Sequence, residues 1–514
     1  MKKIHFFVVF MAFFTPFLFQ LMPLARASGD RDFNPSNSIK IENQMCISHS
    51  PLNWPTHADN LKTLGPKICR NNIEWFRCAH TYGKTAGIFD FTYYDDLLSN
   101  SSARGIEFLG CFVYGWGWWP NNKEVPREDW PYYIDFVEAF CDRYKDNITY
   151  YEMWNEPNIG FWPGTDEDFF EFLELITVEV RSHDPTSFIF SPSPAGVDIE
   201  FMEKMINHFG DAMFNSMFDG MAYHAYSGKN AEYVHQKIVE FQDIMDRHGL
   251  TGDVWITEIG MSTNLPTQQQ IDDYMDEWWL YQATQVVKIY PQTIAANISA
   301  TFWYCHYDWC DVNDTEGEGR FGLMYCQYPS NYTYNYKPAG YAYICLNNLI
   351  DNAMFYPNGI HVEGPVGSNA WAYYYYTPRN TTVLVLWSQG VAGECGISIA
   401  PPSNSTIQGI EFDMIKFDYY TNTSTSKAGK NTHEFQLGNT PVILELNYTG
   451  ALVEEGASIQ PLTVVVTLNY EPETISFLIL VPALLIVGIV LYIHKQKKSR
   501  SSGKLKEKTG VDGT

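Results

Sequence analysis

The sequence predicts an α/β barrel, followed by a C-terminal antiparallel β-sandwich and a single transmembrane helix. Three observations support this order. Short β-rich runs alternate with amphipathic stretches from about residue 44 to 350, as in repeated βα units. Later runs alternate between apolar and polar residues and are separated by turns rather than helices. An uncharged apolar segment then lies near the C-terminus.

Eight β-rich runs, with helical patterns in most of the gaps between them, predict a (β/α)8 barrel, or TIM barrel. The runs are Met45–Ser48, Lys67–Arg70, Ile106–Phe112, Ile148–Met153, Ser187–Phe190, Phe218–His224, Asp253–Glu258 and Ala300–Tyr304. The clearest helix spans Asp166–His183, with Thr165 as its N-cap and Asp184-Pro185 as its stop. The alternative is an open doubly wound sheet. It is less favoured, because no Gly-rich phosphate-binding loop follows the first run.

After about residue 355 the pattern changes to that of an antiparallel sandwich without helices. Its predicted strands include Ala370–Tyr376, Val383–Trp387, Ile410–Phe417 and Val442–Leu446. We therefore divide the body of the chain into a barrel domain over residues 28–354 and a β-sandwich domain over residues 355–470.

Both ends of the chain have the features of targeting segments. Residues 1–27 have a basic start, an apolar stretch and a final Ala25-Arg26-Ala27, which predicts a cleaved signal peptide, with an uncleaved anchor as the alternative. Residues 475–493 carry no charge and are long enough to span a bilayer, and residues 494–514 form a basic tail. Because basic flanks stay in the cytoplasm, we expect a single-pass type I protein of the cell membrane with an extracellular body.

Composition agrees with an exported protein and argues against nucleic acid as a partner. The formal net charge is -25, which opposes binding to a phosphate backbone. Glycosylation sequons occur at Asn100, Asn147, Asn297, Asn313, Asn331, Asn380, Asn404, Asn422 and Asn447. An oxidising compartment permits disulfides among the ten cysteines, and we expect pairs within the group Cys305, Cys310, Cys326 and Cys345. The chain has no Cys-x-x-Cys motif, so a thiolate metal site is not expected.

Two carboxylates follow apolar strands of the predicted barrel. Glu156 lies in Tyr151-Glu152-Met153-Trp154-Asn155-Glu156-Pro157, and Glu258 lies in Trp255-Ile256-Thr257-Glu258. These runs are the fourth and seventh strands of the predicted barrel, whose functional groups gather at the carboxyl ends of the strands. Either glutamate alone is commonly a surface or salt-bridged residue, but together they predict a catalytic pair facing one barrel mouth.

With these residues the chain resembles glycoside hydrolases of clan A, closest in character to families 5 and 39. The resemblance covers residues 44 to about 350 and implies that Glu156 is the acid/base and Glu258 the nucleophile. It also places Arg70, His224, Tyr226 and Trp303 in the positions of the clan's second-, sixth- and eighth-strand residues. One departure is the run Tyr114-Gly115-Trp116-Gly117, which stands where family 5 usually has a histidine.

Glycosidic cleavage needs a protonated carboxyl at the leaving oxygen and an ionised carboxylate at the anomeric carbon. Arg70 is either a partner that keeps Glu258 ionised or part of a structural ion pair, and Tyr226 is a possible donor to the same carboxylate. Asn155 is placed to bind a sugar 2-hydroxyl. His224 is either polar support for the acid or a core histidine. Trp303 and Trp116 are the expected sugar-stacking rings.

The sequence therefore predicts a membrane-anchored extracellular retaining glycoside hydrolase for β-linked oligo- or polysaccharides, without metal or cofactor. A separation of about 5–5.5 Å between the carboxyls would give retention, and about 6.5–9.5 Å would give inversion. The alternative is an inactive carbohydrate-binding or adhesion protein on the same barrel. The sugar, endo or exo action and oligomeric state stay open at this stage.

Overall fold

The structure, a computed structural model, describes residues 39–468 apart from a set of gaps. The gaps are residues 43, 79–87, 116–122, 124, 227, 229, 265–266, 310–316, 327–333, 358–359, 364–369, 380, 389–394, 401–405, 413–424, 427–432, 438 and 450–461. The predicted signal peptide, transmembrane helix and basic tail lie outside the described residues. Within the described part of the chain, no helix is both long and apolar enough to cross a membrane.

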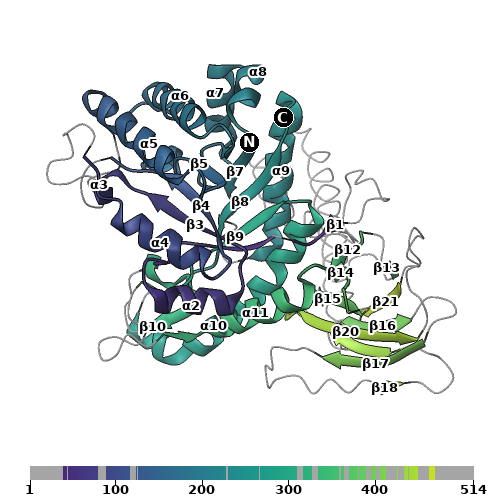
Figure 1. The fold of residues 1–514 in the computed structure, drawn as a ribbon. Coiled ribbons are helices and arrows are strands. Elements are labelled where there is room, and N and C mark those ends of the chain that lie inside the picture. Colours follow the sequence, from purple (N-terminus) through teal and green to yellow (C-terminus); the bar gives the residue numbers. More distant parts are fainter. Residues whose placement is uncertain are drawn as a thin grey trace, which may run out of the picture.

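The predicted barrel is confirmed. Eight parallel strands close on each other in chain order (Figure 1). They are β2 (Met45–Ser48), β3 (Ile68–Ile73), β4 (Glu107–Phe112), β5 (Tyr150–Met153), β6 (Phe188–Phe190), β7 (Gly220–His224), β8 (Asp253–Ile259) and β9 (Ala300–Tyr304). Strand β9 pairs in parallel with β2 and so closes the barrel, with Met45 opposite Thr301 and Ser48 opposite Tyr304. All eight predicted runs lie on these strands, with most ends within two residues.

Helices cover the outside of the barrel (Figure 1). They are α2 (Pro55–Leu64), α3 (Trp75–Cys78), α4 (Thr92–Ser102), α5 (Trp130–Tyr144), α6 (Asp166–His183), α7 (Ile199–Phe209), α8 (Asp211–Met217), α9 (Val234–His248), α10 (Gln268–Ala295) and α11 (Pro338–Ile350). Helix α6 has the predicted bounds, and the Thr165 side chain accepts a hydrogen bond from the Asp168 amide. Such a cap satisfies an amide that the first turn leaves unpaired, so the local sequence sets where the helix begins.

The amino end of the barrel interior is filled by apolar side chains. The cluster consists of Cys46, Ile68, Leu109, Phe190, Ala222, Trp255, Ala300 and Phe302. Its members alternate along the strands with residues that pack outward, as Ala222 does with Tyr223, which belongs to the larger core under the helices. The barrel is therefore a packed apolar core toward this end, and the buried charged residues Arg70, Glu152 and Glu258 lie toward its carboxyl end.

Two sheets follow the barrel and lie beside it (Figure 1). One has the order β1 (Ile39–Lys40), β12 (Met354–Phe355), β14 (Ala370–Tyr376), β15 (Thr382–Ser388), β20 (Val442–Thr449) and β17 (Thr406–Phe412). The other has the order β13 (Ile360–Glu363), β21 (Leu462–Leu468), β16 (Cys395–Ala400), β19 (His433–Leu437) and β18 (Thr425–Ser426).

The antiparallel prediction for this region holds for most strand pairs, but β13 and β21 are parallel. A short strand from before the barrel, β1, pairs with β12 and so belongs to these sheets. The chain therefore enters the barrel from the sheet region and returns to it.

The expected disulfide at Cys305 is contradicted. Cys305 is a buried free thiol that donates to the Tyr307 carbonyl and accepts a hydrogen bond from the Trp309 indole. It lies at the end of β9 under the mouth of the barrel, where it packs as a small buried side chain. Cys310 and the side chain of Cys326 lie outside the described residues.

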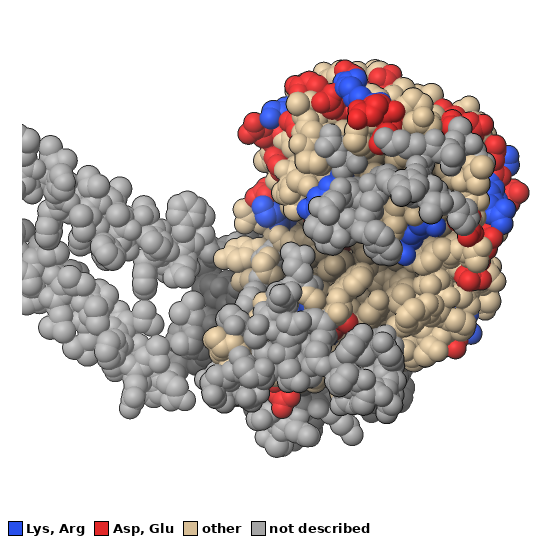
Figure 2. Space-filling model, turned by 90° about the vertical axis from the view of Figure 1, so that its left-hand side faces the viewer, with Lys and Arg blue, Asp and Glu red and all other residues tan. Residues whose placement is uncertain are grey.

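Charges of both signs are interspersed over the described part of the face in Figure 2. Ion pairs of opposite sign connect neighbouring helices on the surface, as between Arg143 of α5 and Asp95 of α4 at 2.7 Å. This arrangement differs from the single-sign stripe that characterises phosphate-binding surfaces.

Candidate active site

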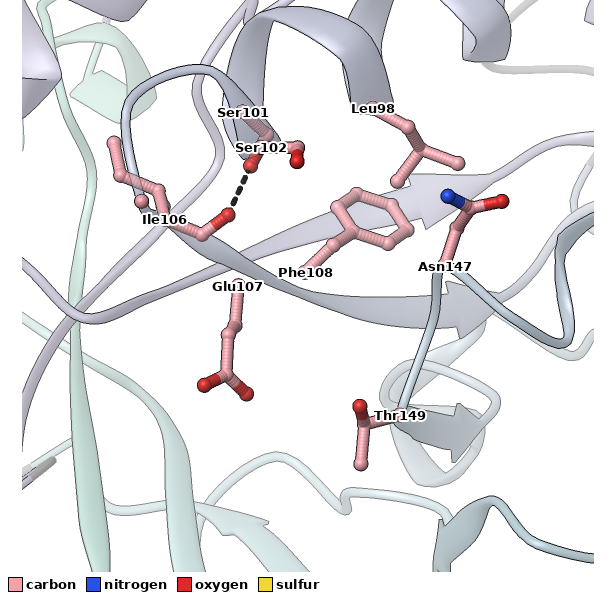
Figure 3. Close-up of a pocket in the computed structure, with 9 residues that line it drawn as sticks. Leu98, Ser101, Ser102, Ile106, Glu107, Phe108, Asn147 and Thr149 are labelled. Carbon is pink, nitrogen blue, oxygen red and sulfur yellow. Dashed lines mark hydrogen bonds between the residues drawn. The ribbon is translucent and has the colours of Figure 1, made fainter.

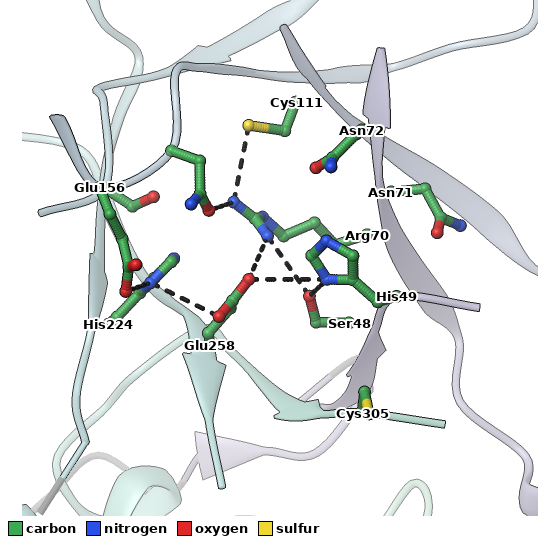
Figure 4. Close-up of polar contacts among 12 residues, drawn as sticks. Ser48, His49, Arg70, Asn71, Asn72, Cys111, Glu156, His224, Glu258 and Cys305 are labelled. Carbon is green, nitrogen blue, oxygen red and sulfur yellow. Dashed lines mark hydrogen bonds and ion pairs between the residues drawn. The ribbon is translucent and has the colours of Figure 1, made fainter. Parts of the chain in front are cut away.

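The two predicted carboxylates meet at the carboxyl end of the barrel. Glu156 lies three residues after β5 and Glu258 lies at the penultimate position of β8. An oxygen of Glu156, an oxygen of Glu258 and a ring nitrogen of His224 all lie within 4.8 Å of one another (Figure 4). Glu258 is 8% exposed and Glu156 12% exposed at the side chain. Both carboxylates therefore share one cup that is largely closed to water.

The backbone around Glu156 has an unusual conformation. Trp154 has φ 87° and Glu156 has φ 43°, values that side chains other than glycine rarely adopt. The Glu156 amide donates to the Ser193 carbonyl at 2.8 Å, and Asn155 forms an isolated bridge with Ser193. Because left-handed residues cost of order 1–3 kcal/mol each, these contacts must hold the turn in place. The turn directs the Glu156 side chain into the cup.

A β-bulge places Glu258 inside the barrel. Tyr223 pairs with Ile256, but the next residue, His224, pairs with Glu258, so β8 contains one extra residue here. The pairing of β8 with β9 shifts in the same interval. Strict alternation would put Glu258 on the same outer face as Ile256, and the bulge turns it inward instead.

Arg70 holds the nucleophile candidate from below. It comes from β3, is fully buried, and donates from one terminal nitrogen to Glu258 at 2.6 Å. Its Nε and other terminal nitrogen donate to both oxygens of Glu152 at 2.8 Å, and the same terminal nitrogen reaches Asn155 Oδ1 at 2.8 Å. Such a bidentate pair fixes the plane of the guanidinium group. Arg70 therefore ties both predicted catalytic strands together.

Glu152 is a site residue that the sequence analysis did not single out. It is fully buried on β5 and accepts a hydrogen bond from the Ser193 hydroxyl as well as from Arg70. The sequence feature that could have pointed to Glu152 is a charged residue within an apolar strand, two positions before Trp154. A buried carboxylate is costly unless a cation or hydrogen-bond donors neutralise it, so a glutamate at this position indicates a cationic partner inside the barrel.

His224 joins the two catalytic candidates. Its Nδ1 lies 2.7 Å from Glu156 and 3.6 Å from Glu258. Burial alone would lower the pKa of His224, but the two carboxylates raise the pKa above its ordinary value. Burial alone would raise the pKa of Glu156, but the attraction and hydrogen bond of His224 and the charge of Arg70 lower it. At rest the proton of this pair therefore resides on the imidazole.

Glu258 has donors on both oxygens. Arg70 donates to one, and the Tyr226 hydroxyl donates to the other at 2.9 Å. Burial raises the pKa of Glu258 above its ordinary value, while His224, Arg70 and Tyr226 oppose that rise. Each oxygen of Glu258 thus accepts a hydrogen bond, an arrangement that suits an ionised carboxylate, because the ionised form is an acceptor only.

His49 is a second residue that sequence analysis missed. It follows β2 with φ 56°, and its Nδ1 lies 2.8 Å from the Ser48 hydroxyl and 3.6 Å from Glu258. Burial, together with the charges of Arg70 and His224, lowers the pKa of His49 to about 3. The ring is therefore neutral and adds a hydrogen-bonding group, without a charge, beside the nucleophile candidate.

The expected stacking role of Trp303 is contradicted. Trp303 is fully buried, belongs to the core under the helices and donates its indole hydrogen to the Phe321 carbonyl at 3.0 Å. The next residue, Tyr304, is half-buried, and its ring meets His49 edge to face at 5.3 Å. Successive strand residues face opposite sides, and the inward set on β9 is Ala300, Phe302 and Tyr304. Trp116 lies outside the described residues.

A separate cavity of about 280 Å³ lies at the opposite end of the barrel (Figure 3). Its lining includes Ile106, Phe108 and Thr149, which stand at or just before the starts of β4 and β5. Asn147, one of the predicted sequons, is at its edge. Because enzymes with this fold use the carboxyl ends of their strands, the cavity is unrelated to the carboxylate cup.

Two groups of carboxylates and histidine have metal-ligand spacing within the described part of the chain. One is the group of Glu156, His224 and Glu258, where the Arg70 cation 2.6 Å from Glu258 opposes a second cation. The other is Glu138, Glu179 and His183 on the outer surfaces of α5 and α6. There His183 already contacts Glu179 at 3.0 Å, an ordinary pair of residues one helical turn apart.

Comparison with known proteins agrees with this arrangement. Residues 111–301 match the family model described as glycosyl hydrolase catalytic core, and this segment contains both Glu156 and Glu258. No curated protein matches the chain by sequence.

Several solved structures share the fold. A family 39 glycoside hydrolase from the gut symbiont Bacteroides cellulosilyticus WH2 has a TM-score of 0.59 and 16% identity over 79% of this chain and 81% of that one. A glucosidase from Croceicoccus marinus has a TM-score of 0.51 and 12% identity over 81% and 98%. A family 51 alpha-L-arabinofuranosidase from Bifidobacterium longum has a TM-score of 0.52 and 11% identity over 80% and 98%.

These likenesses extend over the barrel and the sheets that follow it, and at such identities they establish the fold. With the family match they confirm the resemblance to barrel glycoside hydrolases of clan A. Residues 111–301 are therefore similar to a glycosyl hydrolase catalytic core.

Proposed function

We propose that the chain is a retaining glycoside hydrolase that cleaves β-glycosidic bonds of oligo- or polysaccharides by double displacement. The observation that carries this proposal is that oxygens of Glu156 and Glu258 lie within 4.8 Å of each other. Retaining enzymes hold their carboxyls about 5–5.5 Å apart, whereas inverting enzymes need about 6.5–9.5 Å to admit a water. The short separation supports the first arrangement over the second.

In the first step Glu258 attacks the anomeric carbon while Glu156 protonates the departing oxygen, forming a glycosyl ester on Glu258. Arg70 and Tyr226 direct both oxygens of the nucleophile before attack. Asn155, held by Arg70 at 2.8 Å, faces the same cup and is suited to a sugar 2-hydroxyl. In the second step the Glu156 carboxylate takes a proton from water, which attacks the same carbon and releases Glu258.

His224 supplies the proton that Glu156 delivers. The imidazole carries the proton at rest, and its Nδ1 is hydrogen-bonded to Glu156 at 2.7 Å. A proton can pass along this bond when a sugar displaces water from the cup and the leaving oxygen becomes its final acceptor. After the first step His224 is a neutral imidazole and Glu156 is again a carboxylate. Glu156 can therefore take the proton of the attacking water in the second step and return it to His224 when Glu258 is released as a carboxylate.

The stereochemistry of the product tests the mechanism. We expect nuclear magnetic resonance of a fresh digest of an aryl β-glycoside to show the β-anomer first, with mutarotation following. A 2-fluoro glycoside of the same sugar is expected to accumulate as an ester on Glu258, identified by mass spectrometry of the peptide. Release of the α-anomer, activity on α-glycosides alone, or glycan binding without turnover would contradict the proposal.

The body of the enzyme is proposed to lie outside the cell, anchored by residues 475–493. The support is the sequence pattern of an N-terminal signal, nine sequons and a basic tail after the apolar segment. Protease added to intact cells is expected to remove the activity while sparing a C-terminal epitope tag. Full protection of the activity in intact cells, with release only after lysis, would contradict this location.

A further inference from the structure

We propose that an aromatic strip beside the nucleophile binds the sugars on the glycone side of the scissile bond, so that the enzyme acts within glycan chains. The strip consists of Tyr304, Tyr307, Trp309 and Trp54, and the buried ring of His57 lies between Tyr307 and Trp54. This inference rests on the proposed function and adds a substrate class to it: a chain with at least two sugars before the cleaved bond.

The strip is continuous from the catalytic cup to the surface. Tyr304 meets His49 at 5.3 Å between ring centroids, and Trp309 lies 6.3 Å from the same ring. Trp309 stacks on Tyr307 at 5.7 Å, Tyr307 lies 5.3 Å from His57, and His57 lies 5.3 Å from Trp54. Because His49 touches Glu258, the first ring of the strip stands beside the site of attack.

Both tryptophans of the strip are exposed although they are large and apolar. Trp309 is 52% exposed and Trp54 is 55% exposed. Trp309 is also held in place, because its indole donates to Cys305 Sγ at 3.1 Å and one face stacks on Tyr307 with only 27° between the planes. A fixed, exposed aromatic face costs little entropy on binding and suits the flat apolar face of a sugar ring.

The position of the strip fixes which part of the substrate it meets. The acid Glu156 follows β5, and the leaving group must lie on its side of the cup. In the closed order of eight strands β9 is four strands from β5 in either direction, which is diametrically opposite. Tyr304 ends β9, and Tyr307 and Trp309 follow it. Figure 4 shows the same separation, with Glu156 and His49 on opposite sides of Glu258. The strip therefore faces the glycone.

A single-sugar enzyme has no use for exposed rings beyond the cup on the glycone side. A chain-binding enzyme gains affinity from each additional ring contact, and that gain appears only when the substrate is long enough to reach it. The dependence of activity on substrate length therefore separates the two modes of action.

The test compares substrates of different length on the purified full chain. Aryl β-glycosides of glucose, xylose, mannose and galactose are assayed first to identify the sugar that the cup accepts. The β-linked di- to hexasaccharides of that sugar are then assayed. We expect kcat/KM to rise at least about tenfold between the disaccharide and the tetrasaccharide, and the hexasaccharide to yield products of two or more sugars. Trp309→Ala is expected to remove most of that gain while changing kcat/KM on the aryl monoglycoside less than about twofold.

Tyr341→Ala is the matched control, because Tyr341 is 57% exposed on α11 and lies outside the strip. Trp54→Ala is the second variant and is expected to affect only the longer substrates. An enzyme that hydrolyses the monoglycoside but shows no gain with length, or a Trp309→Ala variant equally impaired on all substrates, would overturn the strip alone. Inactivity of the wild type on every glycoside would overturn the proposed function together with it.

Discussion

The two ends of the barrel are built from the same eight strands but contain opposite chemistry. At the amino end the inward residues are apolar, with Phe302 and Trp255 among the largest. A few residues further along, the inward residues are Arg70, Glu152 and Glu258, all buried and charged. Buried charges are costly unless they are paired, and the apolar end supplies burial that offsets this cost.

Backbone strain is distributed in the same way. Six described residues other than glycine have positive φ, and four of them follow carboxyl ends of barrel strands: His49, Tyr114, Trp154 and Glu156. Strained residues persist where surrounding structure determines them, and they concentrate at functional sites. One end of the barrel therefore stabilises the fold, and that stability offsets the cost of the buried charges and strained backbone at the other end.

The sharpest test of this division is Glu258, the proposed nucleophile at the carboxyl end. Glu258→Ala is expected to lower kcat/KM on an aryl β-glycoside by about 10⁴-fold or more, because no other group can form the ester. The chain is expected to stay folded, since the substitution removes one of three carboxylates around Arg70 and His224. Activity that survives the substitution would assign the nucleophile elsewhere.

Glu156 gives the next largest effect, and the effect depends on the leaving group. Glu156→Ala is expected to lower kcat/KM by about 10²–10⁴-fold on substrates with poor leaving groups. Aryl glycosides with good leaving groups need little protonation, so their first step is expected to be spared. Burst kinetics with two aryl glycosides of different leaving ability measure the difference, and equal losses on both would argue against the acid role.

Glu152 tests whether the support beneath Arg70 acts on catalysis. Glu152→Gln is expected to lower kcat by about 100-fold through loss of the fixed guanidinium orientation. Removing this negative charge leaves Arg70 less neutralised, which lowers the pKa of Glu258. The acid limb of the pH profile is therefore expected to move to lower pH.

The matched control for Glu152 is Glu232→Gln. Glu232 pairs with buried Lys288 at 2.7 Å between η3 (Ala231–Tyr233) and α10. Loss of this pair is expected to lower Tm and leave the pH profile unchanged. A Glu152→Gln variant with the wild-type profile and only a lower Tm would make Glu152 a purely structural partner.

The pH profile of the wild type tests which group titrates in its acid limb and which in its alkaline limb. The pKa of Glu258 is raised, so the nucleophile loses its charge as pH falls and the acid limb is expected above 4.5. The pKa of His224 is raised, so its proton is lost as pH rises and the alkaline limb is expected above 6.5. A kcat/KM profile measured on one aryl glycoside checks both, and an alkaline limb below 6.5 would contradict the proton store on His224.

The amino end is expected to give the smallest effect on activity. Phe302→Leu shortens a buried side chain in the apolar cluster and is expected to cost about 1 kcal/mol of unfolding free energy. Its kcat/KM on the aryl glycoside is expected to stay within about twofold of the wild type. Denaturant unfolding and a rate assay measure the two quantities, and a large loss of activity without loss of stability would break the division between the ends.

The eight strands, the bounds of α6 and the meeting of Glu156 with Glu258 at one mouth were predictable from the sequence alone. These features depend on hydrophobic periodicity and capping, which act over a few residues. The positions of Arg70, His224 and Tyr226 around the carboxylates also followed, through the resemblance to clan A.

The face of the strand on which each candidate site residue lies depends on contacts between strands and could not be read from the sequence. The extra residue in β8 turns Glu258 inward. On β9, Phe302 and Tyr304 face the barrel interior, so Trp303 between them faces the core under the helices. Glu152 gains its role only through contact with Arg70, 82 residues earlier in the chain. A shift of one residue reverses the face of a strand, and this register is set by neighbouring strands rather than by the local sequence.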